Sequence, residues 1–192
     1  MKYSDRKIIL GSNSPRRQEL LRGLDIDFSI DTGNTFEESM DPDIDPHLIP
    51  EEMSAGKSHG FHRVLEDDEI LITADTVVII GDEVLGKPHS REEAVRMLRA
   101  LSGRTHEVVT AVTIRDSRKE ETFSTSTLVT FDVLEDSEID YYIDKYRPYD
   151  KAGAYGVQEW IGYVAISRLE GSFYNVMGFP VHRVYKELQK FL

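Results

Sequence analysis

Apolar and polar residues alternate along this chain with two different periods. Runs typical of β-strands cover residues 7–10, 28–31, 70–73, 76–80, 84–85, 107–115, 122–133 and 164–169. Segments with helical spacing cover residues 15–22, 47–65, 91–101, 136–145 and 180–192. Because strands and helices do not alternate strictly, the pattern predicts an α/β fold with a mixed sheet, and not a doubly wound parallel one.

The first strand-like run ends at Gly11 and leads directly into a helix that begins with two arginines. Ser14 stands where an N-cap belongs, and Pro15 takes the first helical position. A strand-turn-helix junction of this kind points backbone N–H groups outward at the positive end of a helix dipole, which favours an anion. Arg16 and Arg17 add two permanent cations that match phosphate oxygens. The junction predicts a phosphate site. The alternative is an ordinary capped surface helix.

A carboxylate interrupts the apolar sequence between the runs 70–73 and 76–80. Asp75 is disfavoured there unless it is paired or bound to a metal, so it is the best single candidate for a functional residue. The alternative is a turn-forming aspartate between two strands. Together with Glu38, from the acidic loop 33–46, Asp75 would supply the oxygen ligands that Mg²⁺ prefers.

Two lysines and two histidines are weaker candidates. Lys87 lies in a tight Gly-Lys-Pro turn, and Lys57 alone is typical of an exposed helical lysine. His59 and His62, three residues apart on the predicted helix 47–65, have a metal-ligand spacing. A zinc site is disfavoured because no acidic third ligand other than Glu66 lies beside them at helical spacing.

The segment 149–158 has two glycines among small and aromatic residues and ends at Gln158. Glycine allows the backbone to approach a planar group closely, and the Gln158 amide can form hydrogen bonds with the edge of a base. The alternative is a tight glycine loop before a strand.

Composition narrows the choice of function. With 192 residues, the chain is long enough for one domain, or one domain with two lobes. A formal net charge of −12 argues against binding to nucleic acid or to an anionic membrane. There is no cysteine, which excludes disulfides and thiol catalysis. The N-terminal apolar run is too short for a signal peptide or a membrane span, so we expect a cytoplasmic protein. Neither Walker A nor Gly-x-Gly-x-x-Gly follows the first strand.

Six motifs occur in a characteristic order. They are Ser-Asn-Ser-Pro-Arg-Arg (12–17), Ala-Asp-Thr-Val-Val (74–78), Gly-Lys-Pro (86–88), Leu-Ser-Gly-Arg-Thr-His-Glu-Val-Val-Thr (101–110), Asp-Lys-Ala-Gly-Ala-Tyr-Gly-Val-Gln (150–158) and Gly-Ser-Phe-Tyr-Asn-Val-Met-Gly-Phe-Pro (171–180). In this order they resemble the Maf proteins, known as septum-formation inhibitors and nucleoside triphosphate pyrophosphatases. The resemblance covers essentially the whole chain. It implies a single domain over 1–192 with an elongated mixed β-sheet flanked by helices, two lobes around a cleft (an ITPase-like fold), and a homodimer.

The resemblance also implies hydrolysis of a nucleoside triphosphate to the monophosphate and pyrophosphate with a divalent cation, Mg²⁺ foremost, with Mn²⁺ or Co²⁺ as alternatives. Glu38 and Asp75 match the metal-binding carboxylates, and Asp75 also matches the proton acceptor. The residues that match phosphate ligands are Ser12, Arg16, Arg17, Lys57 and Lys87.

The late loop resembles the branch of the family that acts on dTTP and UTP. Arg16, Thr76 and Gln158 match the positions tied to that specificity, whereas Glu159-Trp160 replaces the glycine that commonly follows the glutamine. The choice of Glu38 over its neighbour Glu37 rests on the following Ser39. Two other functions stay open: a pyrophosphatase for modified purine or methylated GTP nucleotides, and a non-catalytic nucleotide-binding regulator of cell division.

Overall fold

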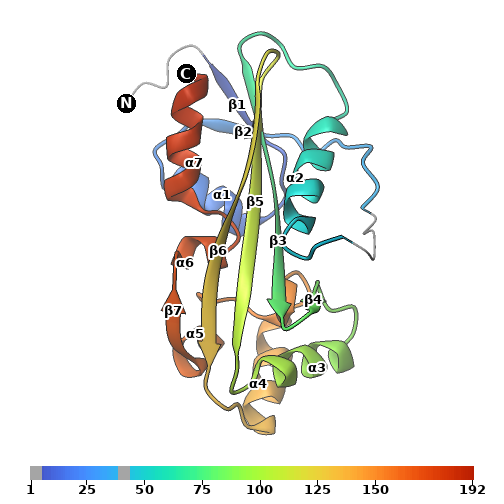
Figure 1. Ribbon diagram of the computed structural model, residues 1–192, viewed down its shortest axis with the longest axis vertical. Helices are drawn as coiled ribbons and strands as arrows, with labels where there is room; N and C mark the ends of the chain where they lie inside the picture. The colour runs from blue at the N-terminus through green and yellow to red at the C-terminus, as the bar shows by residue number, and fades with distance from the viewer. Residues whose placement is uncertain (1–5, 39–43) are drawn as a thin grey trace. The chain divides into compact units, whose positions relative to one another are not determined.

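A mixed β-sheet forms the centre of the fold (Figure 1). The structure, a computed structural model, describes residues 6–38 and 44–192, and in these residues the sheet has seven strands. Their order is β2-β1-β3-β5-β6-β7, and β4 pairs with β3. β1 pairs in parallel with both β2 and β3, whereas β4 and β7 pair antiparallel with their neighbours. The mixed sheet expected from the sequence is confirmed.

The strands are β1 (Lys7–Leu10), β2 (Phe28–Ile30), β3 (Glu69–Ile80), β4 (Glu83–Leu85), β5 (Thr105–Arg115), β6 (Glu120–Phe131) and β7 (Ile166–Glu170). The helices are α1 (Pro15–Arg22), α2 (Ile49–His59), α3 (Arg91–Leu101), α4 (Asp136–Tyr146), α5 (Trp160–Ala165), α6 (Phe173–Val176) and α7 (Val181–Leu188). Short 3₁₀ turns cover Ala152–Ala154 and Gln189–Phe191. None of the helices in the described part of the chain is long and apolar enough to cross a membrane.

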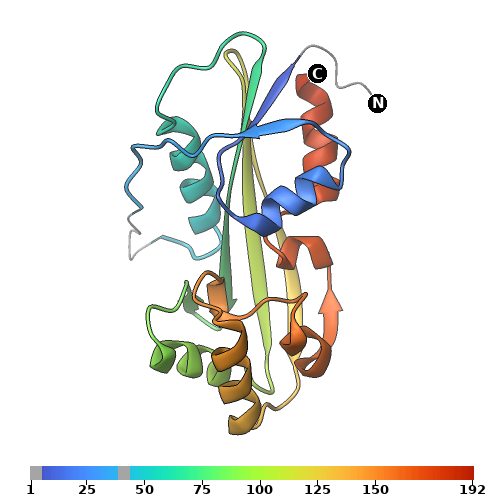
Figure 2. The same ribbon diagram turned by 180° about the vertical axis from the view of Figure 1, so that it is seen from behind.

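The chain divides into two compact units. The first contains the residues up to Asp75 together with 110–125 and 178–192, and the second contains 76–109 and 126–177. In the views of Figures 1 and 2, α1 and α7 of the first unit lie on one side of β3 and α2 lies on the other. In the second unit, α3 packs against α4 and the 3₁₀ turn Ala152–Ala154.

The parallel pairing of β1 with β2 brings the carboxyl ends of these two strands together in the first unit, beside β3, which continues to Ile80. Leu10 at the end of β1 is paired with Ile72 of β3 and with Ile30 of β2. The apolar residues of β1 are almost completely buried, as is typical of a parallel strand that is covered on both faces. Open α/β sheets bind ligands beyond the carboxyl ends of such strands, so this edge is where a site is expected.

The predicted break between the runs 70–73 and 76–80 is wrong. β3 continues without interruption through Ala74 and Asp75, so the interpretation of Asp75 as a turn residue is also wrong. β3 lies between β1 and β5, and neighbouring strands hydrogen-bond its backbone from both sides. These long-range pairings keep the strand extended through a residue type that disfavours strands.

The helix predicted over 47–65 also differs from the structure, because α2 ends at His59. The N–H of Gly60 closes the helix on the Gly56 carbonyl, and the next residue, Phe61, forms a bridge with Asn34. Phe61 and Leu65 are buried in a cluster with Ile9 and Leu71 of the sheet. Their helical spacing therefore reflects burial by tertiary packing, and not a continuing helix.

Most other predicted elements are confirmed within one or two residues. The segments 7–10, 15–22 and 91–101 have the predicted bounds. The tight turn after β3 begins at Gly81, whose φ of +60° suits glycine. The strand predicted over 164–169 is wrong at its start, because the short helix α5 occupies residues up to Ala165.

A buried asparagine holds the Gly-Ser-Phe-Tyr-Asn motif of the second unit in place. The Asn175 Nδ2 donates to the Val108 carbonyl at 3.0 Å and to the Thr127 hydroxyl at 2.9 Å. The Ser172 hydroxyl caps α6 by accepting the Asn175 N–H. This motif therefore ties α6 to strands β5 and β6 in the core.

We expect Asn175→Ala to lower the free energy of unfolding by about 2 kcal/mol, because the Val108 carbonyl would lose its partner inside the core. Urea unfolding followed by circular dichroism measures the change. The exposed Asn13→Ala is the control and should stay within about 0.5 kcal/mol of the wild type. An unchanged urea midpoint for Asn175→Ala would contradict the structural role of this side chain.

Candidate functional site

The register of the parallel strands brings the end of β1 beside the middle of β3 in the first unit. The Gly11 N–H donates to the Ile72 carbonyl at 2.8 Å, which extends the pairing one residue beyond β1. A Cβ on Gly11 would lie 3.0 Å from the Thr73 methyl group, so the two chains pass very close to each other here. The next residue, Ser12, is buried. The Ser-Asn-Ser-Pro-Arg-Arg turn therefore starts alongside the β3 segment that contains Asp75.

Arg17 is a fixed, partly buried cation at the start of α1. Ser14 caps the helix by accepting the Arg17 N–H, and Pro15 occupies the first turn, both as predicted. The Arg17 guanidinium donates to the backbone carbonyls of Ala74 and Gly178, each at 2.9 Å. Burial lowers the pKa of Arg17, and the negative charge of Asp75 opposes this shift. The interpretation as a surface arginine is wrong for Arg17, because its guanidinium also ties three segments together.

Two carboxylates converge on one lysine. The Lys57 Nζ lies 2.6 Å from the Asp75 Oδ1 and 2.8 Å from the Glu38 Oε1. The side chains of Lys57 and Asp75 are only 20% and 19% exposed, whereas that of Glu38 is 63% exposed. Lys57 is therefore not the ordinary exposed lysine that its sequence context predicts. Because both oxygens contact the same nitrogen, the Asp75 Oδ1 and the Glu38 Oε1 must lie near each other.

The alternation of β3 explains why Asp75 meets Lys57. Thr73 and Asp75 point to the same face of the strand. The Thr73 hydroxyl donates to the Ser54 carbonyl of α2 at 2.8 Å, and Lys57 follows Ser54 by three residues, on the same side of the helix. Every residue of β3 is buried except Asp75 and Thr76, which are partly exposed. The strand is therefore partly open at Asp75, whereas its other carboxylate, that of Glu69 at the start of the strand, is buried.

Gly56 in α2 allows the loop before Glu38 to lie against this helix. A Cβ on Gly56 would lie 2.3 Å from the ring of Phe36, so only glycine admits that ring. The Asn34 Nδ2 donates to the Lys57 carbonyl at 2.5 Å, and its Oδ1 accepts the Phe36 N–H at 2.7 Å. These contacts place Glu38, two residues later, beside the Lys57 ammonium. Ser39, on which the preference for Glu38 over Glu37 depends, lies outside the described residues.

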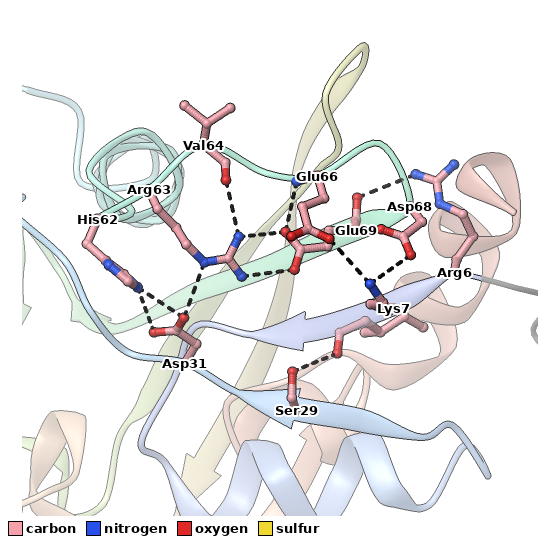
Figure 3. A network of polar contacts seen from close by, with 11 residues as sticks. Arg6, Lys7, Ser29, Asp31, His62, Arg63, Val64, Glu66, Asp68 and Glu69 are labelled. Carbon is pink, nitrogen blue, oxygen red and sulfur yellow. Dashed lines mark hydrogen bonds and ion pairs between the residues drawn. The ribbon is translucent and has the colours of Figure 1, made fainter.

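A second polar network joins the segment after α2 to the start of β3 and to the residue after β2 (Figure 3). The Arg63 guanidinium forms two hydrogen bonds with the Glu69 carboxylate, at 2.6 and 2.9 Å. The His62 Nε2 contacts the Asp31 carboxylate at 3.0 Å, which joins the loop after β2 to the segment after α2 (Figure 3). This network fixes the origin of the loop that carries Glu38.

The prediction that both histidines lie on one helix is wrong, because α2 ends at His59. His59 contacts the Glu120 carboxylate at 2.8 Å, whereas His62 contacts that of Asp31. The two rings therefore bind different carboxylates on different segments.

Arg16 lies in the first unit, next to Arg17 on α1, whereas Thr76, Lys87 and Gln158 belong to the second unit. Thr76 follows Asp75 and points to the opposite face of β3. Lys87 is exposed in the turn after β4. The carbonyl of its neighbour Gly86 accepts the Gly153 N–H at 3.0 Å, so the Gly-Lys-Pro turn adjoins the glycine loop 149–158. Gly153 has a φ of +67° and faces the Val78 side chain at contact distance.

Gln158 carries a buried acceptor at the end of this loop. Its Oε1 is inaccessible to solvent and has no hydrogen-bond partner among the described residues. A buried amide oxygen without a partner costs free energy, and native proteins rarely leave one unsatisfied.

Glu159, which stands where the family commonly has glycine, contacts Tyr142 and Lys151. Its carboxylate accepts the Tyr142 hydroxyl and lies 3.1 Å from the Lys151 Nζ. The Tyr142 oxygen also accepts the Gly156 N–H at 3.0 Å. The sequence analysis did not identify this group. The opposite charges of Lys151 and Glu159, in a segment of small and aromatic residues, could have indicated it.

Comparisons with known proteins identify the family of this chain. The model of the family described as Maf-like protein matches residues 7–191. A Porphyromonas gingivalis protein named dTTP/UTP pyrophosphatase is 56% identical over 187 residues, which is 96% of this chain and 94% of the relative. Relatives with the same name occur in Parabacteroides distasonis, 51% identical over 96% of each chain, and in Flavobacterium johnsoniae, 43% identical over 95% and 93%. The match to the family model over nearly the whole sequence, together with these identities, shows that the chain belongs to the Maf-like protein family.

Proposed function

We propose that this protein hydrolyses nucleoside triphosphates, dTTP and UTP above others, to the monophosphate and pyrophosphate. The observation that carries the proposal is the convergence of the Glu38 and Asp75 carboxylates on Lys57, beside the partly buried Arg17. A triphosphate is bound by cationic side chains, and its divalent cation is bound by carboxylates. A site for both therefore needs the two kinds of side chain next to each other. The names of the curated relatives support the same reaction and the same pair of bases.

Glu38 and Asp75 fit a divalent metal ion. Their oxygens already converge on one positive charge, and Mg²⁺ is typically held by one or two carboxylates while water and substrate phosphates complete its shell. Mn²⁺ and Co²⁺ accept the same ligands. A metal ion bound there would act as a Lewis acid on a phosphate oxygen.

The chain's own residues supply the acid–base chemistry and the charge. Asp75 takes the proton of the attacking water, the task of a positioned general base. Arg17 is held by two backbone carbonyls, so its charge is oriented before the substrate binds and needs no reorganisation as charge develops on the pyrophosphate. Ser12, Arg16, Lys57 and Lys87 complete the set of proposed phosphate ligands.

Gln158 recognises the base in this proposal. Uracil and thymine present an N3–H donor between two carbonyl oxygens, and the buried Gln158 Oε1 is an acceptor in need of such a donor. The amide NH₂ can meet the O4 of the base. Cytosine has no N3–H, so it would leave the amide mispaired, and a site built on hydrogen bonds rejects such a base strongly. Arg16 and Thr76 are assigned to specificity from the family resemblance alone. The expected homodimer, the role in septum formation and the cytoplasmic location stay predictions.

The deciding experiment measures pyrophosphate release from dTTP, UTP, CTP, the purine triphosphates and a methylated GTP in the presence of Mg²⁺. We expect dTTP and UTP to be cleaved most efficiently. Release from none of them would favour the non-catalytic nucleotide-binding regulator. A preference for methylated GTP would leave the reaction standing and overturn the role of Gln158.

Asp75→Asn removes the proton acceptor and one negative charge while it keeps the shape of the side chain. We expect kcat to fall by about 10²-fold or more, the contribution of a positioned general base, with the fold intact. Steady-state kinetics on dTTP measures the effect. Asp82→Asn, in the exposed turn after β3, is the matched control. A variant at position 75 that keeps more than about a third of the wild-type kcat would contradict the assignment.

The two arginines should separate in their effect on stability. Arg17→Ala should lower both kcat/KM and the Tm, because two backbone carbonyls lose their buried donor. Arg16→Ala should lower kcat/KM with little change in Tm. Differential scanning calorimetry alongside kinetics tests this difference. Equal Tm values for the two variants would mean that the Arg17 contacts do not stabilise the fold.

Gln158→Ala should reduce the preference for dTTP over CTP more than it reduces the rate with the best substrate, because the lost contact distinguishes the bases. The measurement is the ratio of kcat/KM values for the two substrates. Gln189→Ala, an exposed change after α7, is the control. An unchanged ratio would remove Gln158 from base recognition.

A further inference from the structure

The hydroxyl of Tyr142 contacts the loop of Gln158 at two points. Tyr142 is completely buried on α4. Its oxygen accepts the Gly156 N–H at 3.0 Å, and its proton is donated to the Glu159 carboxylate. Gly156 precedes Gln158 by two residues and Glu159 follows it directly. A single hydroxyl therefore fixes the backbone before Gln158 and the side chain after it.

A largely buried ion pair closes the same loop from the other side. The Lys151 Nζ lies 3.1 Å from the Glu159 Oε1, and the two side chains are 9% and 19% exposed. A Cβ on Gly156 would lie 2.9 Å from the Glu159 carboxyl carbon and 3.1 Å from the Lys151 Cε, so both side chains pack directly over this glycine. Buried ion pairs contribute little to stability, and their best-supported role is to specify one conformation.

Tyr155 anchors the middle of the loop in the core. Its hydroxyl lies 2.7 Å from the His106 Nε2, and both side chains are buried. Burial lowers the pKa of His106 to about 4, so the ring is neutral at physiological pH. The loop is thus held on both sides of Gln158, by His106 through Tyr155 and by Tyr142 through Gly156 and Glu159.

We propose that Tyr142, together with Glu159, is a positioning residue for base recognition, which keeps the Gln158 amide in the one orientation that accepts an N3–H. This inference rests on the proposed function, because it assigns the orientation of the residue that reads the base. Hydrogen bonds discriminate between bases only where the protein group is fixed and cannot turn to meet the wrong partner. A displacement of about 1 Å in such a group is enough to cost about 10²-fold in efficiency.

Tyr142→Phe tests the proposal, since it removes the hydroxyl and keeps the buried ring. We expect the ratio of kcat/KM for dTTP over CTP to fall by about tenfold or more, through a higher KM for dTTP with kcat changed by less than about threefold. Tyr141→Phe is the matched control. It is the neighbouring residue on α4, its hydroxyl accepts the Lys145 ammonium at 2.7 Å, and the change keeps the ring that packs against Trp160. The control should keep the wild-type ratio.

Glu159→Gln provides a second test that keeps an acceptor for the Tyr142 hydroxyl and removes the charge that pairs with Lys151. It should lower the same ratio, and it carries the test alone if Tyr142→Phe does not fold. A merely structural role would lower the Tm and reduce kcat/KM for all substrates equally, so an unchanged ratio in the folded variants would overturn the proposal.

Gln158→Ala, measured in the same series, separates the two levels of the argument. If it lowers the ratio and the two positioning variants do not, only the inference about Tyr142 fails. If the wild type does not prefer dTTP over CTP, or if Gln158→Ala leaves the ratio unchanged, base recognition by Gln158 fails and the positioning role is overturned with it.

Discussion

The contact of the Lys57 ammonium with two carboxylates is the constraint around which the first unit is arranged. Asp75 lies within a continuous strand whose other residues are almost all buried. A carboxylate in such a place costs folding free energy unless a cation compensates its charge. Lys57 supplies that charge from α2, and the loop packed on Gly56 brings a second carboxylate, that of Glu38, to the same ammonium. The register of β3 and the packing of α2 both follow from the need to bring these charges together.

Two backbone carbonyls fix the Arg17 guanidinium in the first unit. Arg17 donates to Ala74, next to Asp75 in the strand, and to Gly178, before α7. A guanidinium held in this way cannot move far from the carboxylate beside it. The same contacts join α1 to β3 and to the segment before α7, so the orientation of this cation depends on the fold around it.

In the second unit, hydrogen bonds of tyrosine hydroxyls hold the loop that carries Gln158. A base has no net charge and differs from other bases only in its donors and acceptors, so a fixed amide is the appropriate group to recognise it. The hydroxyls of Tyr142 and Tyr155 hold the loop of Gln158 through hydrogen bonds. The Lys151 ammonium contacts two carboxylates, that of Asp150 at 2.7 Å and that of Glu159 at 3.1 Å, so a charged cluster holds the same loop.

The sequence by itself determined the elements that depend on neighbours in the chain. The helix 15–22 begins where Ser14 and Pro15 place it, because capping and a fixed φ act locally. Asp75 was identifiable as a candidate because an acid in an apolar run is unusual wherever that run folds. Tertiary structure decided the rest. The continuity of β3 depends on hydrogen bonds from strands distant in sequence, and the role of Lys57 depends on carboxylates 19 and 18 residues away on either side. No periodicity or local preference encodes such pairings, because their energy exists only once the segments have met.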